Sequence, residues 1–587
     1  MNNKQTLQNF IFPVNTVFGS QEKYYRSSGV VFYDGNSLKM RKGSVVSFDT
    51  YYNAFSVPLW GTSVGITEAD LSISGNGKIK IELVEYTENY FSKKVSEETM
   101  SLDSAFQEAF HVKIEKSEFT GLLFAKIIAL EDTEIQRMSW ETGNIPLRNV
   151  KLGITITHYN RKQYVIPAMK RIKENLLDSS DWANKINFQV VDNSRNITEE
   201  ESMGVRIIPN ENTGGSGGFT EGFLYYKNNT DVTHVLFMDD DASLEIESVK
   251  RAYSILQFAK NDNAAVGAAL FYEEHPNVFI ERGAFLGDVW VDAEFHDLDS
   301  TDIKILMDSE VFWQKHPRKR PYIGWWFCAF PVKDTKRLVP PFFIRGDDVS
   351  FTQINNYDII FGNGIACYAE GFTGKTAPMT EYLDTINPFI VNALFVGRPR
   401  KVFAFYKSLY LSALFGARYQ YVELYRLALK DFLKSDGQQM IDRIKGIPTN
   451  TTFKDIISTE ILKNIDLEDY NIANWENEGE SRLSTRIRQL TLNRQFLPLN
   501  NKKVILQEYS RIPFLQSISG YRNILYFNSY SQKGFVAKVD RWKTIKFLLL
   551  FVVDHLKYAF LYRGARKRLL RDYDKLTSEE MWQDILK

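Results

Sequence analysis

The sequence predicts an α/β protein whose central domain is preceded by a β domain and followed by a mainly helical region. Short alternating stretches such as residues 45–57 and 78–86, separated by turn signals, are typical of a β-sandwich. Strands then alternate with helical patterns across residues 151–242, which indicates a parallel sheet covered by helices. Residues 403–433 show long helical periodicity, and the rest of the chain reads as mainly helical.

Length and composition agree with this organisation. At roughly 150 residues per domain, the 587 residues correspond to about three or four domains. We place an N-terminal β-sandwich domain at residues 1–148, an α/β domain at 149–395 and a helical region at 396–587. A hydrophobic content of 44% with 25% charged residues excludes a disordered chain. The 72 Lys+Arg balance 72 Asp+Glu, which argues against nucleic-acid binding over the whole surface.

The cysteines and the apolar runs indicate the compartment. Cys328 and Cys367 are too few for a disulfide framework or a cysteine-rich zinc site. The N-terminal residues lack the charged start and apolar core of a signal peptide. The longest purely apolar run near the C-terminus, residues 547–553, is far shorter than the roughly 18 residues that span a bilayer. We therefore expect a cytoplasmic protein with two free thiols.

Aromatic residues are unusually abundant, at 14% of the chain. In the N-terminal domain, Tyr51, Tyr52, Phe55 and Trp60 have two interpretations. They form a surface on which sugars stack, or they fill the core of the sandwich. The general distribution of aromatic residues favours the core.

A glycine-rich segment follows the predicted strand at residues 205–210. The sequence NTGGSGGFTEGF at 212–223 has four glycines in five residues, which let the backbone approach a ligand closely and point N–H groups at an anion. It is neither a Walker loop nor a proper GxGxxG fingerprint. A flexible turn and a diphosphate-binding loop explain the composition equally well, and the position at a strand end favours binding.

Three adjacent carboxylates give a stronger signal. The apolar strand at residues 235–238 leads directly into Asp239, Asp240 and Asp241. Alternation along an extended chain puts Asp239 and Asp241 on one side, about 6–7 Å apart, close enough to share a hard cation. An acidic N-cap for the next helix is the alternative, but it needs one carboxylate and not three. The pattern favours a metal site.

A third cluster combines tryptophans with carboxylates. Trp325 and Trp326 follow a glycine, Gly324, which leaves room for a ligand ring beside an indole. Asp347 and Asp348 lie where an apolar stretch gives way to a helix, and one of them is placed to take a proton from a hydroxyl nucleophile. An N-cap aspartate with a surface neighbour explains this segment equally well.

Together the three clusters indicate a nucleotide diphosphate, a bridging metal, a sugar-stacking surface and a carboxylate base. This set fits glycosyl transfer by direct displacement with inversion, in which the metal neutralises the departing diphosphate. A glycosidase instead uses paired carboxylates and has no diphosphate site.

At these motifs the sequence resembles the GT-A-fold inverting galactofuranosyltransferase family, most closely its mycobacterial polymerising galactan members. The motifs occur in family order and spacing, and the resemblance covers most of the chain. They are DTYYNAFSVPLW (49–60), THYNR (157–161), VVDNS (190–194), NTGGSGGF (212–219), FMDDDA (237–242), GWWF (324–327) and FIRGDD (343–348).

The resemblance implies a Rossmann-like GT-A fold and a role for each motif. Asp239 and Asp241 would hold Mn²⁺ or Mg²⁺, and Asp348 would be the base, with Asp347 beside it in the catalytic pair. Trp325 and Trp326 would shape the sugar and acceptor site. The residues implied to bind the UDP-sugar donor are Tyr159, Arg161, Asp192, Asn212, Gly214, Gly215 and Asp240.

Two departures from the family pattern stand out. The family has a further metal ligand, a histidine in a Trp-His pair, where this chain has Tyr368 and Ala369. The neighbouring Glu370 is the candidate replacement, which would give an all-oxygen site suited to Mg²⁺ or Mn²⁺; a weakly bound metal, or one that enters with the nucleotide, is the alternative. The family also has an acidic residue where this chain has Ala284, so donor-sugar or acceptor preference is expected to differ.

The resemblance also implies partners: a UDP-sugar donor, a lipid-linked glycan acceptor and a homo-oligomer. Residues 542–573 join an apolar helix face to several arginines, a pattern that suits peripheral contact with the inner face of the plasma membrane. A helix packed on the protein body with a solvated basic face is an equal alternative. Two other functions stay open: the same fold with a different nucleotide-sugar donor, or a catalytically silent glycan-binding protein.

Overall fold

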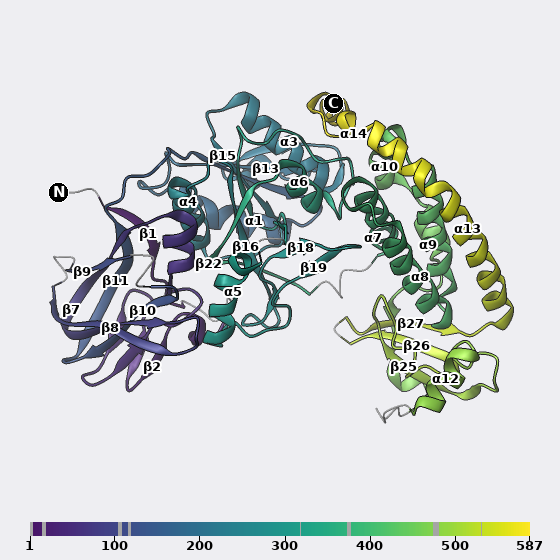
Figure 1. The fold of residues 1–587 in the computed structure, drawn as a ribbon, viewed down its shortest axis with the longest axis horizontal. Coiled ribbons are helices and arrows are strands. Elements are labelled where there is room, and N and C mark those ends of the chain that lie inside the picture. Colours follow the sequence, from purple (N-terminus) through teal and green to yellow (C-terminus); the bar gives the residue numbers. More distant parts are fainter. Residues whose placement is uncertain are drawn as a thin grey trace.

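The computed structural model describes residues 4–13, 19–103, 108–114, 119–316, 319–371, 377–473, 481–529 and 531–587. Along the long axis of the molecule, strands of the N-terminal part are followed by a mixed α/β centre and then by a group of long helices with a small sheet below them (Figure 1).

The N-terminal part is an eleven-stranded arrangement centred on one long strand, β7 (Glu68–Tyr86). The first half of β7 pairs with β11 and its second half with β10, so β7 belongs to both halves of the sheet. The other strands are β1 (Gln5–Asn9), β2 (Arg26–Ser28), β3 (Val31–Tyr33), β4 (Leu38–Met40), β5 (Val45–Ser47), β6 (Phe55–Ser56), β8 (Ser92–Leu102), β9 (Glu108–Lys113), β10 (Leu122–Ala129) and β11 (Thr133–Thr142).

The N-terminal aromatic residues are core residues. Tyr51, Tyr52, Phe55 and Trp60 are fully buried. The ring of Phe55 in β6 lies 4.7 Å from that of Trp140 in β11, so rings from the two halves meet in the interior. The sugar-stacking interpretation of these four residues is therefore wrong, because none of them reaches the surface.

The centre is an eight-stranded mixed sheet in the order β14-β13-β12-β15-β21-β16-β17, with β22 also paired to β16. The first four strands of this order are parallel, and β21 runs antiparallel between β15 and β16. The strands are β12 (Leu152–His158), β13 (Ile186–Asp192), β14 (Arg206–Pro209), β15 (His234–Asp239), β16 (Ala264–Tyr272), β17 (Phe279–Glu281), β21 (Cys328–Pro331) and β22 (Asp358–Ala369). The α/β prediction is confirmed.

Helices cover this sheet, and a small three-stranded sheet lies at its side. The helices are α1 (Lys162–Ile172), α2 (Glu199–Ser202), α3 (Gly214–Asn229), α4 (Ile246–Phe258), α5 (Ile303–Lys315) and α6 (Asp347–Asn355). The small sheet consists of β18 (Ala284–Leu286), β19 (Val291–Ala293) and β20 (Pro321–Tyr322).

The glycines of α3 allow that helix to pack closely on β12. A Cβ at Gly218 would lie 2.3 Å from Thr157 Cγ2, and one at Gly222 would lie 2.3 Å from Thr155 Cγ2. The segment predicted as a flexible or anion-binding loop is thus helical from Gly214 onward. At least two of its glycines serve helix–strand packing, since any side chain there would separate the two elements.

The C-terminal part combines long helices with a five-stranded sheet (Figure 1). Its helices are α7 (Pro378–Val391), α8 (Pro399–Phe415), α9 (Tyr419–Lys434), α10 (Gly437–Gly446), α11 (Thr452–Ile456), α12 (Arg482–Leu490), α13 (Arg541–Arg571), α14 (Tyr573–Leu576) and α15 (Glu579–Leu586). Its strands are β23 (Lys463–Asn464), β24 (Ile472–Ala473), β25 (Asn500–Glu508), β26 (Tyr521–Asn528) and β27 (Lys533–Lys538). The mainly helical prediction missed this sheet, because short apolar runs do not distinguish buried strands from helix segments.

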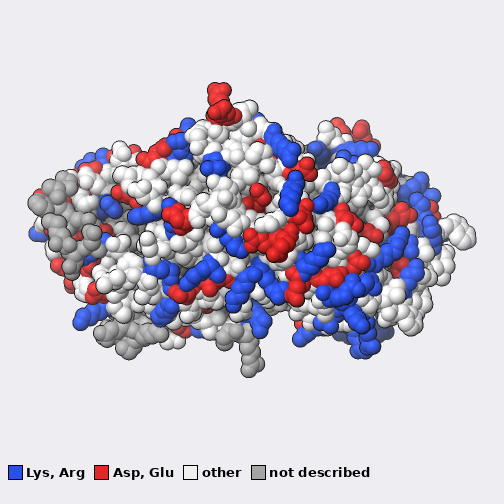
Figure 2. Space-filling model, turned by 90° about the horizontal axis from the view of Figure 1, so that it is seen from above, with Lys and Arg blue, Asp and Glu red and all other residues white. Residues whose placement is uncertain are grey.

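Charge is unevenly distributed although it sums to zero. Seen from above, Asp and Glu gather near the middle of the molecule, whereas Lys and Arg gather over the C-terminal part (Figure 2). The helix α13 runs along the outer edge of this part (Figure 1). Among the described residues, no helix combines the length and the apolar character needed to cross a membrane.

Candidate functional site

A cleft with two chambers lies at the carboxyl ends of β12 and β15. Each chamber has a volume of about 610 Å³. The first chamber is lined by residues such as Tyr159, Asn193 and Asn212, and the second by residues such as Trp325 and Asp348. The chambers share the side chains Arg161, Gly215, Phe219, Asp239, Asp240 and Ile344. A ligand that spans both chambers would therefore pass the aspartates.

The aspartate triplet at the end of β15 is held by neighbours from β12 and α1. Arg161 Nη1 donates to Asp241 Oδ2 at 2.6 Å and to Asp240 Oδ1 at 3.3 Å. His158 Nδ1 lies 3.4 Å from Asp240 Oδ2, and this buried ring also contacts Asn196. Asp240 is thus engaged on both oxygens by residues that follow β12. The charges of Asp241 and Asp240 in turn raise the pKa of Arg161 above its ordinary value, against the effect of its partial burial.

The second pair of carboxylates, Asp347 and Asp348, begins α6. The Ser216 hydroxyl donates to Asp347 Oδ2 at 3.0 Å, and the Val349 N–H donates to Asp348 Oδ1 at 2.7 Å. Burial raises the pKa of Asp347, and burial together with the charge of Asp347 raises that of Asp348 well above its ordinary range. Asp348 lines the second chamber, so a carboxyl with strong affinity for a proton faces the cleft.

A strained loop positions this pair. Phe343 and Arg345 have φ angles of 78° and 67°, and Gly346 has 92°. The Asn387 side chain donates to the carbonyls of residues 344 and 345, which holds the loop from α7. A Cβ at Gly214 would lie 2.1 Å from the Phe343 carbonyl oxygen, so the start of α3 packs directly on this loop. Residues in such backbone regions persist only where surrounding contacts hold them.

The two tryptophans differ in role. Trp325 is 5% exposed and packs edge-on against the rings of Phe219 and Phe237, but it still lines the second chamber. The indole of Trp326 folds back over Gly324, since a Cβ at Gly324 would be 2.1 Å from Trp326 Cη2. The space predicted for a ligand beside Gly324 is therefore filled by Trp326. Both indole N–H groups are buried without a hydrogen-bond partner in the described structure.

Two of the predicted site residues, Asp192 and Glu370, lie apart from the lining of the chambers. Asp192 is 1% exposed, and its carboxylate accepts the N–H groups of residues 194, 196 and 197, so it shapes the loop after β13. Glu370 lines neither chamber among the described residues. Tyr368 points to the N-terminal part, where its hydroxyl contacts Tyr52 at 2.5 Å and accepts from Lys23 at 2.8 Å.

Glu370 nevertheless belongs to the same electrostatic neighbourhood as Asp241. Burial and then the charge of Glu370 raise the pKa of Glu273, and the charge of Asp241 adds to this shift. Among the described residues, no group of three or more His, Cys, Asp or Glu is arranged so that it could hold a metal ion. Asp239 and Asp241 supply carboxylates at the cleft, and Mg²⁺ is usually held by one or two carboxylates plus substrate phosphates. These residues therefore fit a metal that arrives with a nucleotide.

Sequence reasoning missed two residues of the second chamber. Glu281, at the end of β17, is 6% exposed and hydrogen-bonded to Tyr322, and burial raises its pKa to about 8. Trp290 lies over the loop before α6, because a Cβ at Gly346 would be 3.2 Å from Trp290 Cη2. Arg398 anchors the turn before Trp290 through an ion pair with Asp288. The sequence carried one signal for Glu281 and none for Trp290: Glu281 lies three residues before Ala284, where the chain departs from the family pattern.

Comparisons with known proteins agree with the motifs. Residues 16–143 match the family model "Galactofuranosyltransferase 2 N-terminal". The chain is 24% identical over 422 residues to the galactofuranosyltransferase GlfT2 of Mycolicibacterium smegmatis, covering 68% of this chain and 65% of that protein. By sequence, the chain is GlfT2-like. The predicted resemblance is confirmed.

A second relative has the same description. GlfT2 of Mycobacterium tuberculosis is 24% identical over 334 residues, which cover 54% of this chain and 52% of that protein. The matched part thus spans less than two thirds of either relative. A solved structure described as GalNAc-T7 with UDP, GalNAc and Mn²⁺ is 8% identical over 43% of this chain and 52% of that chain, with a TM-score of 0.30, too low to carry an argument.

Proposed function

We propose that the protein is an inverting, metal-dependent glycosyltransferase of the GT-A type that moves galactofuranose from UDP-galactofuranose to a growing bacterial surface polysaccharide. The observation that carries the proposal is the two-chambered cleft, in which aspartates lie at the junction and the carboxyl pair Asp347 and Asp348 lines the second chamber. The similarity to proteins named galactofuranosyltransferase supports the choice of sugar.

In this proposal the first chamber takes the nucleotide. Tyr159, Asn212, Gly214 and Gly215 line it, and the N-terminus of α3 faces it. The N–H groups of Gly214 and Ser216 already donate to Asn212 Oδ1 and to the Phe343 carbonyl, so it is the dipole at the helix N-terminus that favours an anion such as a diphosphate. Asp239, which lines both chambers, and Asp241, which lines the second, would hold Mn²⁺ or Mg²⁺. The chemistry that such a metal supplies is neutralisation of the departing diphosphate.

Asp348 would act as the general base in the second chamber. Asp348 must be ionised to act as a base, and the raised pKa of its carboxyl makes that carboxylate a stronger proton acceptor than an ordinary aspartate. Asp347 holds Ser216 and keeps the start of α6 in register with α3. The acceptor would lie against Trp325, Trp326 and Glu281, which line the same chamber. Attack on the face opposite the diphosphate gives inversion at the anomeric carbon.

The proposal includes a lipid-linked acceptor and peripheral contact of the protein with the membrane. The helix α13 leaves Trp542, Leu549, Leu556 and Phe560 exposed, and its acidic residue Asp554 is already paired with Arg426. An exposed apolar face with flanking cations suits the surface of an anionic membrane. The basic residues of α13 are Arg541, Lys543, Lys546, Lys557, Arg563, Arg566, Lys567, Arg568 and Arg571. A homo-oligomer, implied by the resemblance, is part of the same proposal.

The test is an assay of the purified protein with UDP-galactofuranose, Mn²⁺ and a galactofuranoside acceptor. We expect UDP release coupled to an acceptor that is longer by one or more hexoses, with an inverted anomeric configuration by NMR. UDP-galactopyranose and UDP-glucose are the matched donors. Faster turnover with either would reassign the donor, and binding of glycan without any UDP release from the three donors would identify a catalytically silent binding protein.

A further inference from the structure

The first chamber is closed on one side by residues from the C-terminal part of the chain. Residues 447–451, Phe453 and Lys454 line it together with Tyr159 and Asn212. These two sets are more than two hundred residues apart in the sequence, and no motif in the sequence pointed to this wall. The cleft is therefore completed by a segment outside the predicted α/β domain.

This wall is a built element of the fold. Phe453 is 4% exposed, and its ring lies 4.7 Å from that of Tyr382 in α7. The Tyr382 hydroxyl donates to Asp431 Oδ2 in α9 at 2.8 Å, which ties the contact to a second helix. Asn450 Oδ1 accepts the Thr452 N–H at 2.9 Å and fixes the turn that leads into α11. These contacts fix the backbone that carries Lys454.

The charged residues that line the first chamber indicate a role for Lys454 in binding an anion. The lining of the first chamber contains the acids Asp239 and Asp240 and the cations Arg161 and Lys454. Arg161 is engaged with Asp240 and Asp241. Across the described ranges Lys454 takes part in no ion pair, and its side chain is exposed at the wall of the chamber. An ammonium group without an ion-pair partner among the described residues thus lines the same chamber as Asp239 and Asp240.

We propose that Lys454 is a donor-binding residue whose ammonium contacts the anionic diphosphate of the nucleotide donor. The inference rests on the proposed function, since it requires a nucleotide in the first chamber. The lysine ammonium is a compact point charge on a flexible stem, so this contact depends on the charge of the diphosphate and not on the shape of the nucleotide's base. The C-terminal part would then contribute directly to donor affinity, beyond any role in assembly or membrane contact.

The experiment compares UDP with uridine, which carries no phosphate. Binding of each to the full chain is measured by titration calorimetry in the presence of Mn²⁺. A charge-assisted contact at an exposed site predicts that Lys454→Ala weakens UDP binding about three- to tenfold and leaves uridine binding unchanged. Lys454→Arg should restore UDP affinity, and the defect should shrink in high salt because the contact is screened.

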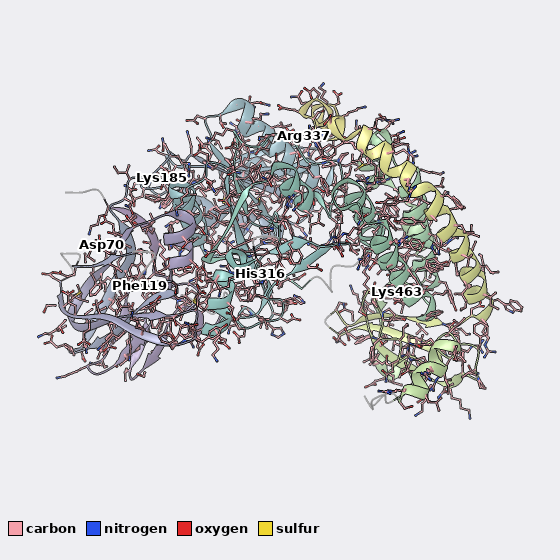
Figure 3. All side chains as sticks on the ribbon, viewed as in Figure 1. Asp70, Phe119, Lys185, His316, Arg337 and Lys463 are labelled. Carbon is pink, nitrogen blue, oxygen red and sulfur yellow. The ribbon has the colours of Figure 1, made fainter. Side chains whose placement is uncertain are left out.

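Lys463→Ala is the matched control, because Lys463 is exposed on β23 in the same part of the chain and lines neither chamber among the described residues (Figure 3). In turnover assays, Lys454→Ala should raise KM for the donor by a similar factor with kcat within twofold.

Three outcomes would overturn the inference. Equal UDP affinity in Lys454→Ala and wild type would show that the Lys454 ammonium does not contact the diphosphate. An equal loss for UDP and uridine, or the same loss in Lys454→Arg, assigns the residue to wall packing. Wild-type protein that binds no UDP overturns the proposed function itself, and the inference with it.

Discussion

The two acidic clusters of the cleft contain the same residue type but lie in opposite environments. Asp240 and Asp241 contact the Arg161 guanidinium, and the triplet lies where both chambers meet. At the start of α6, Asp347 is buried and Asp348 is partly buried, and they accept hydrogen bonds from a serine hydroxyl and a backbone N–H. Burial raises the pKa of both members of this second pair.

The difference teaches how one fold separates two tasks for a carboxylate. A carboxylate beside a cation is stabilised in its charged form, whereas a buried carboxyl beside another carboxyl is stabilised in its protonated form. The first environment suits binding of a cation, and the second suits transfer of a proton. Three predictions test this division, beginning with the largest expected effect, and a fourth tests the packing of α3 beside the carboxyl pair.

Removal of the base should have the largest effect. Asp348→Asn retains the shape of the side chain but cannot accept a proton from the acceptor hydroxyl. Because general base catalysis typically contributes about 10²- to 10⁴-fold, we expect kcat to fall by about that factor. UDP affinity, measured by calorimetry, should remain within twofold of wild type.

Asp347→Asn is the matched control for this experiment. Its carboxylate accepts the Ser216 hydroxyl, so the substitution should disturb the packing of α6 on α3 and lower kcat less than Asp348→Asn does. If Asp348→Asn keeps wild-type turnover, or if Asp347→Asn is the more damaging variant, the assignment of the base is wrong.

Loss of the metal-binding carboxylates comes next. Asp239→Asn and Asp241→Asn should each lower Mn²⁺-dependent UDP affinity by about 10- to 100-fold, a typical cost of disturbing a metal site. Uridine binding should be spared, because it needs no cation. Titrations with Mn²⁺ and with excess EDTA measure the metal-dependent part.

Asp240→Asn is the comparison within the triplet. Asp240 is engaged by Arg161 and His158, so its substitution should lower thermal stability more than it changes the Mn²⁺ dependence. An equal loss of Mn²⁺ dependence in all three variants would contradict the distinct role of Asp240.

Glu281 is a further carboxyl that burial favours in its protonated form, as it does Asp347 and Asp348. Its pKa is raised to about 8 by burial, so the folded state keeps a proton that the unfolded state releases above the ordinary value of 4.5. Its contribution to stability is therefore complete below pH 4.5 and is lost as the pH rises through about 8. Between pH 5 and 9 the wild type should lose a few kcal/mol, at about 1.4 kcal/mol per pKa unit.

Glu281→Gln, which mimics the protonated form, should flatten this part of the profile. Urea unfolding at pH 5, 7 and 9 measures the difference between wild type and variant. Parallel profiles for the two proteins would show that Glu281 does not carry the pH dependence.

The sequence predicted the parts of the site that lie on one continuous segment. The apolar run before Asp239 gave both β15 and the placement of the triplet at its end, because strand and carboxylates are adjacent in the chain. The position of Asp347 and Asp348 at a helix start was equally local. The parallel direction of β12, β13, β14 and β15 followed from the alternation of strands and helices, whereas the antiparallel strand β21 was not predicted.

Contacts between distant segments were not predictable in the same way. The engagement of Arg161 with Asp241 depends on the pairing of β12 with β15. The wall at residues 447–454 depends on how α7 and α9 pack on the α/β part. The purpose of the glycines was also hidden, since composition alone does not separate a glycine that faces a ligand from one that faces a strand.

The glycines of α3 offer the smallest and most local test. Gly222→Ala would place a methyl group 2.3 Å from Thr155 Cγ2 in the core, and such overpacking typically costs about 1–3 kcal/mol. At Gly215, on the same helix, the nearest atom to a Cβ is Asp347 Oδ2 at 3.5 Å, an ordinary contact. Gly215→Ala should leave the Tm unchanged or raise it, since alanine favours a helix over glycine by about 1 kcal/mol. Because the methyl group of Gly215→Ala enters the cleft beside the carboxyl pair Asp347 and Asp348, any defect of this variant should be in turnover. Equal Tm values for Gly222→Ala and Gly215→Ala would contradict the packing argument.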